Sequence, residues 1–363
     1  VHDYDNLRVA LEHLQATGRV AHAVRLCGAL GWFWEEAGYV DEGAACISQV
    51  LPLAEDEDPP IAARLFLAAA CNKALSEQGD YGHRALEIYR RVGDRLGMAR
   101  AMAVLGSHRM FDRIPLARQR RLMEDALAIY EEENRPWDEA MVILQLGFLA
   151  HFSGDGAAAL QFADRAAERF TELGDDYCLA VAMEAQAGCL HHSDVDAAIR
   201  LQEQANAKMA VSGPPGEVAF GISQIAEMRL DANEPDKAIP LFNQAATLYR
   251  RLGDQRERVV SVAFIGLAHR AAGRLDDARA TFGAAIDLSM LHYPDALIWI
   301  LECVAGLAAH MGDGLTATRL LGAAESYREE RQQPMFWWDH FRYDPDVEMA
   351  QAGTDAEAFE EAW

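Results

Sequence analysis

Lysine is nearly absent from this chain of 363 residues, which contains only Lys73, Lys208 and Lys237. None of the three ends a GxxxxGK pattern followed by Ser or Thr, so the sequence has no phosphate-binding P-loop. It also has no GxSxG elbow or other nucleophile motif. We therefore expect no catalytic residue, no cofactor and no enzymatic activity in this chain.

Long apolar runs and paired cysteines are missing too. No run approaches the ~18 apolar residues of a membrane-spanning helix, and no signal peptide opens the chain. The six cysteines lack paired spacing and are typical of reduced core residues. They are Cys27, Cys46, Cys71, Cys178, Cys189 and Cys303. These absences predict a cytoplasmic protein without a membrane segment.

Basic residues are scarce relative to acidic ones, since 33 lysines and arginines stand against 57 aspartates and glutamates. The resulting net charge of −24 repels the phosphates of nucleic acids and of anionic lipids. We therefore expect neither a direct nucleic-acid partner nor a membrane partner.

One short pattern is present three times, as EIYRRVGDRLGMAR (87–100), ERFTELGDDYCLAV (168–181) and TLYRRLGDQRERVV (247–260). The glycines of its Gly-Asp pairs are 81 and 79 residues apart, and Asn134 and Gly213 lie about halfway between them. Gly and Asn most easily adopt the left-handed conformation that ends a helix, and a following Asp can cap the next helix. The spacing therefore predicts helix joints with a period of about 40 residues.

A second series of turns interleaves with the first. Its members are Gly38, Gly79, Gly154, Ser193, Asn233, Gly273 and Gly312. Between the turns, apolar residues recur with helical spacing, and no stretch alternates with the two-residue period of a strand. We therefore predict an all-α fold, an α-α superhelix (solenoid) of about eight antiparallel, tetratricopeptide-like helical hairpins. The second helix of the second hairpin is expected to be short, because only 14 residues separate Gly79 from Gly93.

A column of mostly small residues lies seven positions before the turns. Its small members include Gly31, Gly106, Gly147, Ala226, Gly266 and Ala305. Small side chains at one repeated position allow neighbouring helices to approach closely. The column therefore predicts close helix-to-helix packing at this position.

Both ends of the chain resemble a known family. DYDNLRVALEHLQATG at the start is similar to the DNLRAAL segment that follows the nucleotide-binding module in large bacterial signal-transduction (STAND) ATPases. The Tyr-Arg-Arg-Leu-Gly-Asp copies resemble the tetratricopeptide-like repeats that close those proteins, and RLLGAAESYREERQQP and GTDAEAFEEAW resemble the characteristic end. The segment MFWWDHFRYDPD departs from the family, because it is more aromatic than the proline-rich segment that is usual at this place.

The resemblance implies the C-terminal repeat region of a LuxR-type or adenylyl-cyclase-associated regulator, which receives a signal and controls an attached ATPase. We expect a lead-in helix at 1–19 after a missing upstream nucleotide-binding module, a repeat array at 20–333 and a capping segment at 334–363. The expected partner is a protein, a peptide or a small-molecule inducer. Two alternatives are a free-standing tetratricopeptide-type peptide-binding adaptor and an enzyme with a helical-toroid fold, for which we find no convergent acid–base residues.

In tetratricopeptide-type arrays the first helix of each hairpin lines a concave groove, which is the natural binding surface. The residues that we expect to face this groove are Trp32, Phe66, Lys73, Arg100, Met141, Leu144, Phe148, His151, Phe220, Glu227 and Trp299. An apolar groove rimmed by charge suits a peptide helix, a partner domain or an apolar small molecule. The alternative is that hairpin packing buries these side chains.

Two clusters contain residue types that bind metal ions. They are His191, His192, Asp194 and Asp196, and Asp339, His340, Asp344 and Asp346. The histidine pair lies at a predicted turn, without a second cluster of ligands nearby in the sequence. We expect both clusters to be solvated and to hold no metal.

Overall fold

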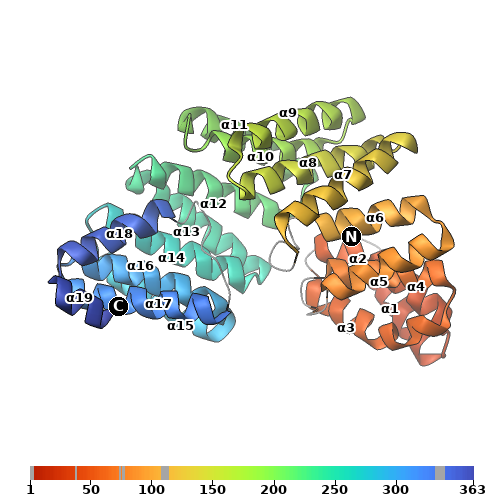
Figure 1. Cartoon of the computed structure of the whole chain (residues 1–363), viewed down its shortest axis with the longest axis horizontal. Coiled ribbons are helices and arrows are strands. Elements are labelled where there is room, and N and C mark those ends of the chain that lie inside the picture. The colour runs from red at the N-terminus through yellow and green to blue at the C-terminus, as the bar shows by residue number, and fades with distance from the viewer. Residues whose placement is uncertain (1–3, 37–38, 73–74, 76–77, 108–113, 332–339) are drawn as a thin grey trace. The chain divides into compact units, whose positions relative to one another are not determined.

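The structure is a computed structural model of the 363-residue chain, and it describes residues 4–36, 39–72, 75, 78–107, 114–331 and 340–363. Within these ranges every regular element is helical and none is a strand, as predicted (Figure 1). Consecutive helices pack as eight hairpins, α2/α3 to α16/α17, with α1 before them and α18 and α19 after them. The predicted all-α helical-repeat class is confirmed.

The internal contacts of the chain divide it into two compact units, Val1–Gly174 and Asp175–Trp363. The helices of the first unit are α1 (Tyr4–Ala16), α2 (Val20–Glu36), α3 (Val40–Val50), η1 (Leu51–Asp56), α4 (Pro59–Cys71), α5 (Gln78–Val92), α6 (Arg95–Gly106), α7 (Leu116–Glu132), α8 (Pro136–Phe152) and α9 (Gly156–Leu173). The helices of the second unit are α10 (Asp176–Leu190), α11 (Val195–Ser212), α12 (Pro215–Asp231), α13 (Pro235–Leu252), α14 (Gln255–Ala271), α15 (Leu275–His292), η3 (Pro294–Ala296), α16 (Leu297–His310), α17 (Gly314–Arg331), α18 (His340–Ala352) and α19 (Ala356–Ala362).

The Gly-Asp pairs are helix joints. Gly174 and Gly253 end α9 and α13 with φ angles of +67° and +79°, a conformation that favours glycine. Asn134 adopts a positive φ as expected. Gly213 also ends a helix, α11, as predicted, but with a φ of −98° and not in the left-handed conformation. Proline follows Gly213 directly and biases it toward extended backbone.

The aspartates of these joints cap the helices that follow. Each accepts a hydrogen bond from the backbone N–H three residues ahead, which leaves one fewer orphan donor in the first turn. The capping residues are Asp94, Asp155, Asp175, Asp194, Asp254, Asp313 and Asp355.

Glycines of the small-residue column lie where two helices nearly touch. A Cβ at Gly31 would lie 2.3 Å from Ala68 Cβ, and one at Gly266 would lie 2.6 Å from the Phe282 ring. A larger residue at either position would push its helix from its neighbour. The short second hairpin is also confirmed, since α5 has 15 residues where α9 and α13 each have 18.

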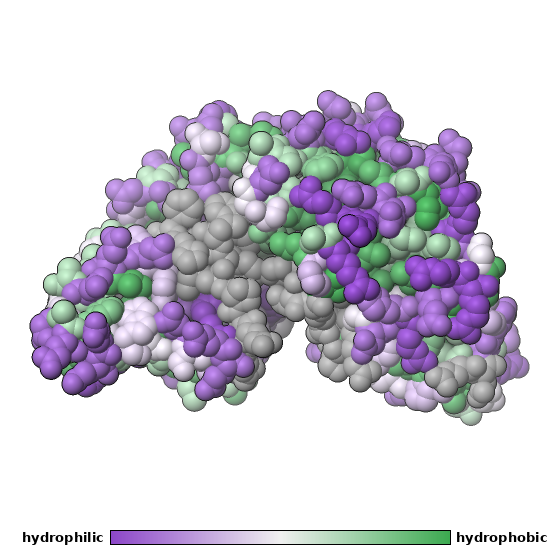
Figure 2. Space-filling view, in the orientation of Figure 1, coloured by the Kyte–Doolittle hydropathy of each residue, from purple (hydrophilic) through white to green (hydrophobic). Residues whose placement is uncertain are grey.

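The terminal segments pack on the outermost hairpins of their own units. Helix α1 lies against α2, where the buried Trp34 Nε1 donates a hydrogen bond to the Tyr4 hydroxyl at 2.7 Å. Helix α18 packs on α16 and α17, and α19 packs on α17. Hydrophilic side chains dominate the visible surface of α19, while apolar ones are interspersed among hydrophilic ones over α6 to α9 (Figure 2).

Candidate functional site

The predicted groove residues of the first unit are not all accessible. Phe66 and Leu144 are each 1% exposed, so both belong to the core and not to a binding surface. The Arg84 guanidinium lies 4.2 Å from the Phe66 ring centroid and covers its face. Trp32 is 50% exposed, Arg100 is half-buried, and Lys73 lies outside the described residues.

Helix α8 contributes the other predicted residues of this unit. Met141, Phe148 and His151 are half-buried, and the α8 positions between them include fully buried residues. The helix is apolar on nearly all sides because it packs between α7 and α9. A receptor surface at Met141, Phe148 and His151 stays a prediction.

In the second unit the structure brings two predicted residues together around an arginine that sequence analysis did not select. Glu227 of α12 accepts a hydrogen bond from Arg342 of α18 at 3.1 Å. The Arg342 guanidinium also lies 5.3 Å from the Phe264 ring centroid, and that ring is 5.2 Å from the ring of Trp299. Phe220, the third predicted residue of this unit, is 40% exposed on α12.

Arg342 is held mainly by charge. Its guanidinium donates to Asp231 Oδ1 at 2.7 Å as well as to Glu227, so one arginine pairs with two carboxylates of α12. Burial alone would lower the pKa of Arg342, but Glu227 and Asp231 raise it above its ordinary value. Burial raises the pKa of Asp231, yet His191 and Arg342 together hold it below its usual range. Both partners of this contact are therefore ionised at neutral pH.

A second ion pair fixes the same helix one turn further on. Arg270 of α14 donates to Asp346 of α18 at 2.6 Å, and their side chains are only 10% and 8% exposed. The pair lies on Gly306 of α16, where a Cβ would come within 2.0 Å of the Asp346 carboxylate. Glycine at this position thus leaves the space that the ion pair fills.

These contacts define a surface that we call the α18-contact face. Its residues are Glu227, Asp231, Phe264, Arg270, Trp299 and Gly306. They come from α12, α14 and α16, the first helices of three successive hairpins. A small cavity lies against α18 here, lined by Leu267, Arg270, Trp299, Glu302, Cys303, Arg342, Tyr343 and Asp346.

The cavity contains a thiol and a phenol, but neither is activated. Burial raises the pKa of Cys303 to about 12 and that of Tyr343 to about 12, so both are protonated at neutral pH. Glu302 accepts two hydrogen bonds of 2.7 Å from Arg328 of α17 and is occupied in linking α16 to α17. The chemistry of the α18-contact face is that of binding charged and aromatic groups.

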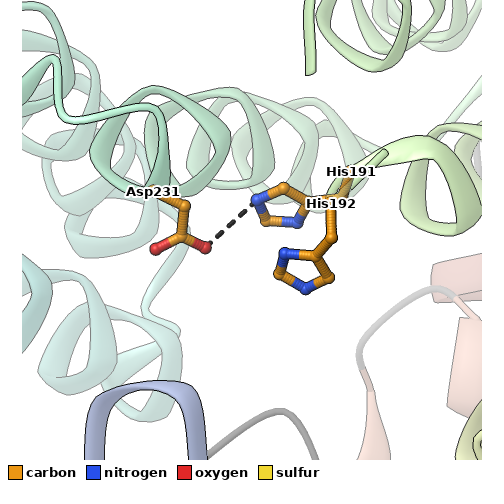
Figure 3. Close-up of side chains that lie close together, drawn as sticks. All are labelled: His191, His192 and Asp231. Carbon is orange, nitrogen blue, oxygen red and sulfur yellow. Dashed lines mark ion pairs between the residues drawn. The ribbon is translucent and has the colours of Figure 1, made fainter. Parts of the chain in front are cut away.

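A histidine pair lies beside this face. His191 and His192 follow α10, and His191 Nε2 lies 3.1 Å from Asp231 Oδ2 (Figure 3). One ligand atom from each of the three residues lies within 4.8 Å of the others. The two imidazole rings are stacked, however, with centroids 4.4 Å apart and an angle of 11° between their planes.

The stacking decides whether these residues fit a metal. An ion bound by an imidazole lies near the plane of the ring, on the lone pair of its nitrogen. Two parallel rings therefore cannot both bind one ion until one of them turns. Sequence analysis paired the histidines with Asp194 and Asp196, whereas the structure places Asp231 of the next hairpin beside them. The prediction that this cluster holds no metal stays a prediction.

Arg342, Asp231 and Arg270 are the residues of the candidate site that sequence analysis missed. Arg342 is 111 and 115 residues away from its two partners, and Asp346 is 76 residues from Arg270. A groove assignment could have used the positions of Asp231 and Arg270, which lie near the ends of α12 and α14, the first helices of their hairpins. Asp231 is also four residues after Glu227. Arg342 carried no such signal, because it lies outside the repeats.

No described helix is both long and apolar enough to cross a bilayer. No protein-family model and no curated protein matches the chain. Solved structures do match. With a TM-score of 0.60 and 12% identity, 94% of this chain is similar to all of a Rap protein complexed with competence and sporulation factor.

Two further structures are similar. The Rap conjugation gene regulator of plasmid pLS20, in complex with the Phr* peptide, matches 87% of this chain and 96% of its own, with a TM-score of 0.55 and 12% identity. The tetratricopeptide-repeat sensor protein of the STAND class from Pyrococcus horikoshii has a TM-score of 0.60 and 13% identity, covering 91% of this chain and 50% of the other. At such identities the likeness shows the fold, a tetratricopeptide-like helical repeat.

Proposed function

We propose that this chain is the sensor and scaffold repeat region of a bacterial signalling ATPase or transcriptional regulator. A protein or peptide signal binds its repeats and controls an attached module. The observation that carries the proposal is the α18-contact face, which already binds a helix through an arginine and an aspartate. Paired acids, a separate arginine and aromatic rings suit a peptide better than an apolar small molecule.

The similar structures support both parts of the proposal. The two Rap structures were determined in complex with competence and sporulation factor and with the Phr* peptide, and the STAND protein has a tetratricopeptide repeat as its sensor. The resemblance of both chain ends to signal-transduction ATPases points the same way. A LuxR-type or adenylyl-cyclase-associated parent follows from that resemblance alone.

The alternative is a free-standing peptide-binding adaptor. It is favoured by the coverage of the Rap structures, because this chain matches 100% and 96% of their lengths. In that case the repeats would act without an attached ATPase. The coding sequence upstream of Val1 separates the two: a P-loop module there supports the sensor region, and a start codon there supports the adaptor.

The experiment uses the complete protein encoded at this locus. Glu227→Ala should change the ATP hydrolysis or reporter transcription of that protein in response to its inducing conditions, because it weakens the binding face. Glu203→Ala on α11, an exposed acid, is the matched control and should leave the response unchanged. An unchanged response in Glu227→Ala and in Asp231→Ala would overturn the proposal.

A further inference from the structure

We infer that α18 occupies the α18-contact face in place of the signal. The signal is a partner helix that carries an arginine and, four residues later, an acid, and this helix displaces α18 from the face. This inference rests on the proposed function and names how its site is regulated. It starts from the register of the two ion pairs. Arg342 and Asp346 are four residues apart and therefore project from one side of α18.

The face discriminates the direction of the bound helix. It offers two carboxylates to Arg342 and one guanidinium to Asp346, so a helix placed in the opposite direction would set like charges against each other. Glycine at position 306 leaves room for the Arg270–Asp346 pair, since any Cβ there would overlap the Asp346 carboxylate. The face is thus built for a helix with this charge order, whichever chain supplies it.

Several features of α18 suit it to being displaced. Pro345 lies inside the helix, where proline removes a backbone donor and disfavours the helical conformation. Among the α18 side chains that the structure describes, Tyr343, Val347 and Ala350 pack on the second unit's core. The contact with Glu227 and Asp231 is also partly open, since the Arg342 side chain is 24% exposed.

Buried ion pairs support exchange more than permanent attachment. Charged pairs in an interior add little net stability compared with apolar packing, but they specify which group can occupy a site. A segment that served only to cover the last hairpin would be held better by apolar residues. α18 instead meets α12 and α14 through charged side chains.

Because α18 belongs to the same chain, it competes at a high effective concentration. A partner helix therefore binds weakly while α18 is in place and more tightly once α18 is loosened. The test uses a fluorescent peptide of residues 340–352, HFRYDPDVEMAQA, as the competitor and follows its anisotropy with the full chain. The chains compared are the wild type, Arg342→Ala and Gly306→Ala, with Glu203→Ala as control.

Arg342→Ala should bind this peptide about tenfold or more tightly than the wild type, because the intramolecular competitor is weakened. Gly306→Ala should loosen α18 but also exclude the peptide's aspartate, so it should not gain affinity. A peptide with Arg342→Glu should bind neither the wild type nor the Arg342→Ala chain. A Glu227→Arg/Asp231→Arg chain should prefer that peptide over the native one. Glu203→Ala should bind like the wild type.

Equal binding of the native peptide by the wild type and by Arg342→Ala would overturn the inference and show that α18 is a fixed part of the fold. Circular dichroism on every variant verifies that the helices remain. If Arg342→Ala loses its helical content, Arg342→Lys, which keeps the charge, replaces it with the same expected direction. The result is separable from the proposed function, since peptide exchange can occur even if Glu227→Ala leaves the output of the complete protein unchanged.

Discussion

The two units of the chain bury different kinds of side chain. In the first unit, buried apolar residues from α1 to α8 form one connected cluster that includes Trp34, Phe66 and Met123. In the second unit, the described apolar clusters are smaller and rich in alanine, and the buried residues include the charged Glu302 and Asp346. Apolar burial stabilises without specifying partners, whereas buried charge requires one particular partner.

The buried polar groups of the first unit have a different task. Asn72 donates to the Val40 carbonyl at 2.9 Å, and Gln119 donates to the Ser107 carbonyl at 2.9 Å. These neutral amides satisfy backbone groups near helix ends. The charged pairs of the second unit instead join side chains of separate helices. The first unit therefore relies mainly on apolar packing, whereas the second unit also depends on specific charged pairs between helices.

The largest expected effect is on the first unit's core. Trp34→Ala should lower the free energy of unfolding by about 3–5 kcal/mol, because Trp34 is 1% exposed and its removal leaves a cavity. Trp32→Ala, on the same helix but 50% exposed, should cost less than about 1 kcal/mol. Urea denaturation measures both. Similar losses for the two variants would show that this core is not what stabilises the unit.

The ion pair between α16 and α17 should come next. Glu302→Ala removes the two hydrogen bonds that Glu302 accepts from Arg328 in a largely buried place and should cost about 3 kcal/mol. Glu87→Ala breaks the exposed pair with Arg91 in the first unit and should cost less than about 0.5 kcal/mol. Thermal melts of the two variants test the contrast between the units. A Glu302→Ala protein as stable as the Glu87→Ala protein would contradict this contrast between the units.

A partly buried glutamate should make the second unit sensitive to pH. Burial raises the pKa of Glu184 on α10 to about 8, although a hydrogen bond from Gln202 at 2.7 Å acts in the opposite direction. The folded chain therefore keeps this proton up to about pH 8, whereas the unfolded chain loses it near pH 4.5. Stability from this group is complete below pH 4.5 and is lost as the pH rises to about 8.

Glu184→Gln should abolish this dependence and raise the free energy of unfolding at pH 8 by about 1–3 kcal/mol. Glu203→Gln, an exposed acid on the neighbouring α11, should keep the wild-type profile. Urea midpoints between pH 5 and pH 9 provide the measurement. A Glu184→Gln profile parallel to that of the wild type would contradict the assignment.

A smaller effect is expected at the predicted receptor surface on α8. Phe148→Asp should lower the free energy of unfolding by about 1 kcal/mol while abolishing any ligand binding there, because Phe148 is half-buried. Leu144→Asp places a charge at a side chain that is 1% exposed and should cost several times as much, on the order of 4 kcal/mol. Equal falls in melting temperature would assign Phe148 to the core and end the surface prediction for α8.

The smallest expected effect concerns the stacked histidines. Zinc at about 0.1 mM should leave the melting temperature unchanged, because the parallel rings of His191 and His192 cannot share an ion. Differential scanning fluorimetry detects the shift, with His192→Ala as the matched variant. A rise of several degrees that disappears in His192→Ala would identify a metal site.

The sequence was sufficient to predict the repeated joints but not the site. Gly174, Gly253 and Asn134 could be predicted, because left-handed residues have a local chemical preference and the 40-residue period repeated it. The joint at Gly213 was predicted as well, but its extended backbone was not, because the following proline favours that conformation. Local patterns of this kind determine where helices begin and end.

The candidate site depends on contacts that no local pattern contains. Glu227 and Trp299 were predicted from helical spacing, but Arg342, which joins them, is 115 residues from Glu227. Leu144 was wrongly assigned to a groove, since α8 is apolar on most of its sides and spacing alone cannot tell which side faces a neighbouring helix. Both failures concern which surfaces meet.

The capped joints have a consequence for mutational tolerance. Each aspartate that begins a helix contributes only about 1 kcal/mol to stability. The same arrangement is repeated along the chain, so the loss of one cap removes a small part of the total stability. The start of α12 illustrates this redundancy: Pro214 precedes it without a side-chain cap, and the hairpin α12/α13 still forms. Drift at single joints is therefore tolerable during evolution, whereas Arg342 joins three groups at one position and leaves far less freedom for replacement.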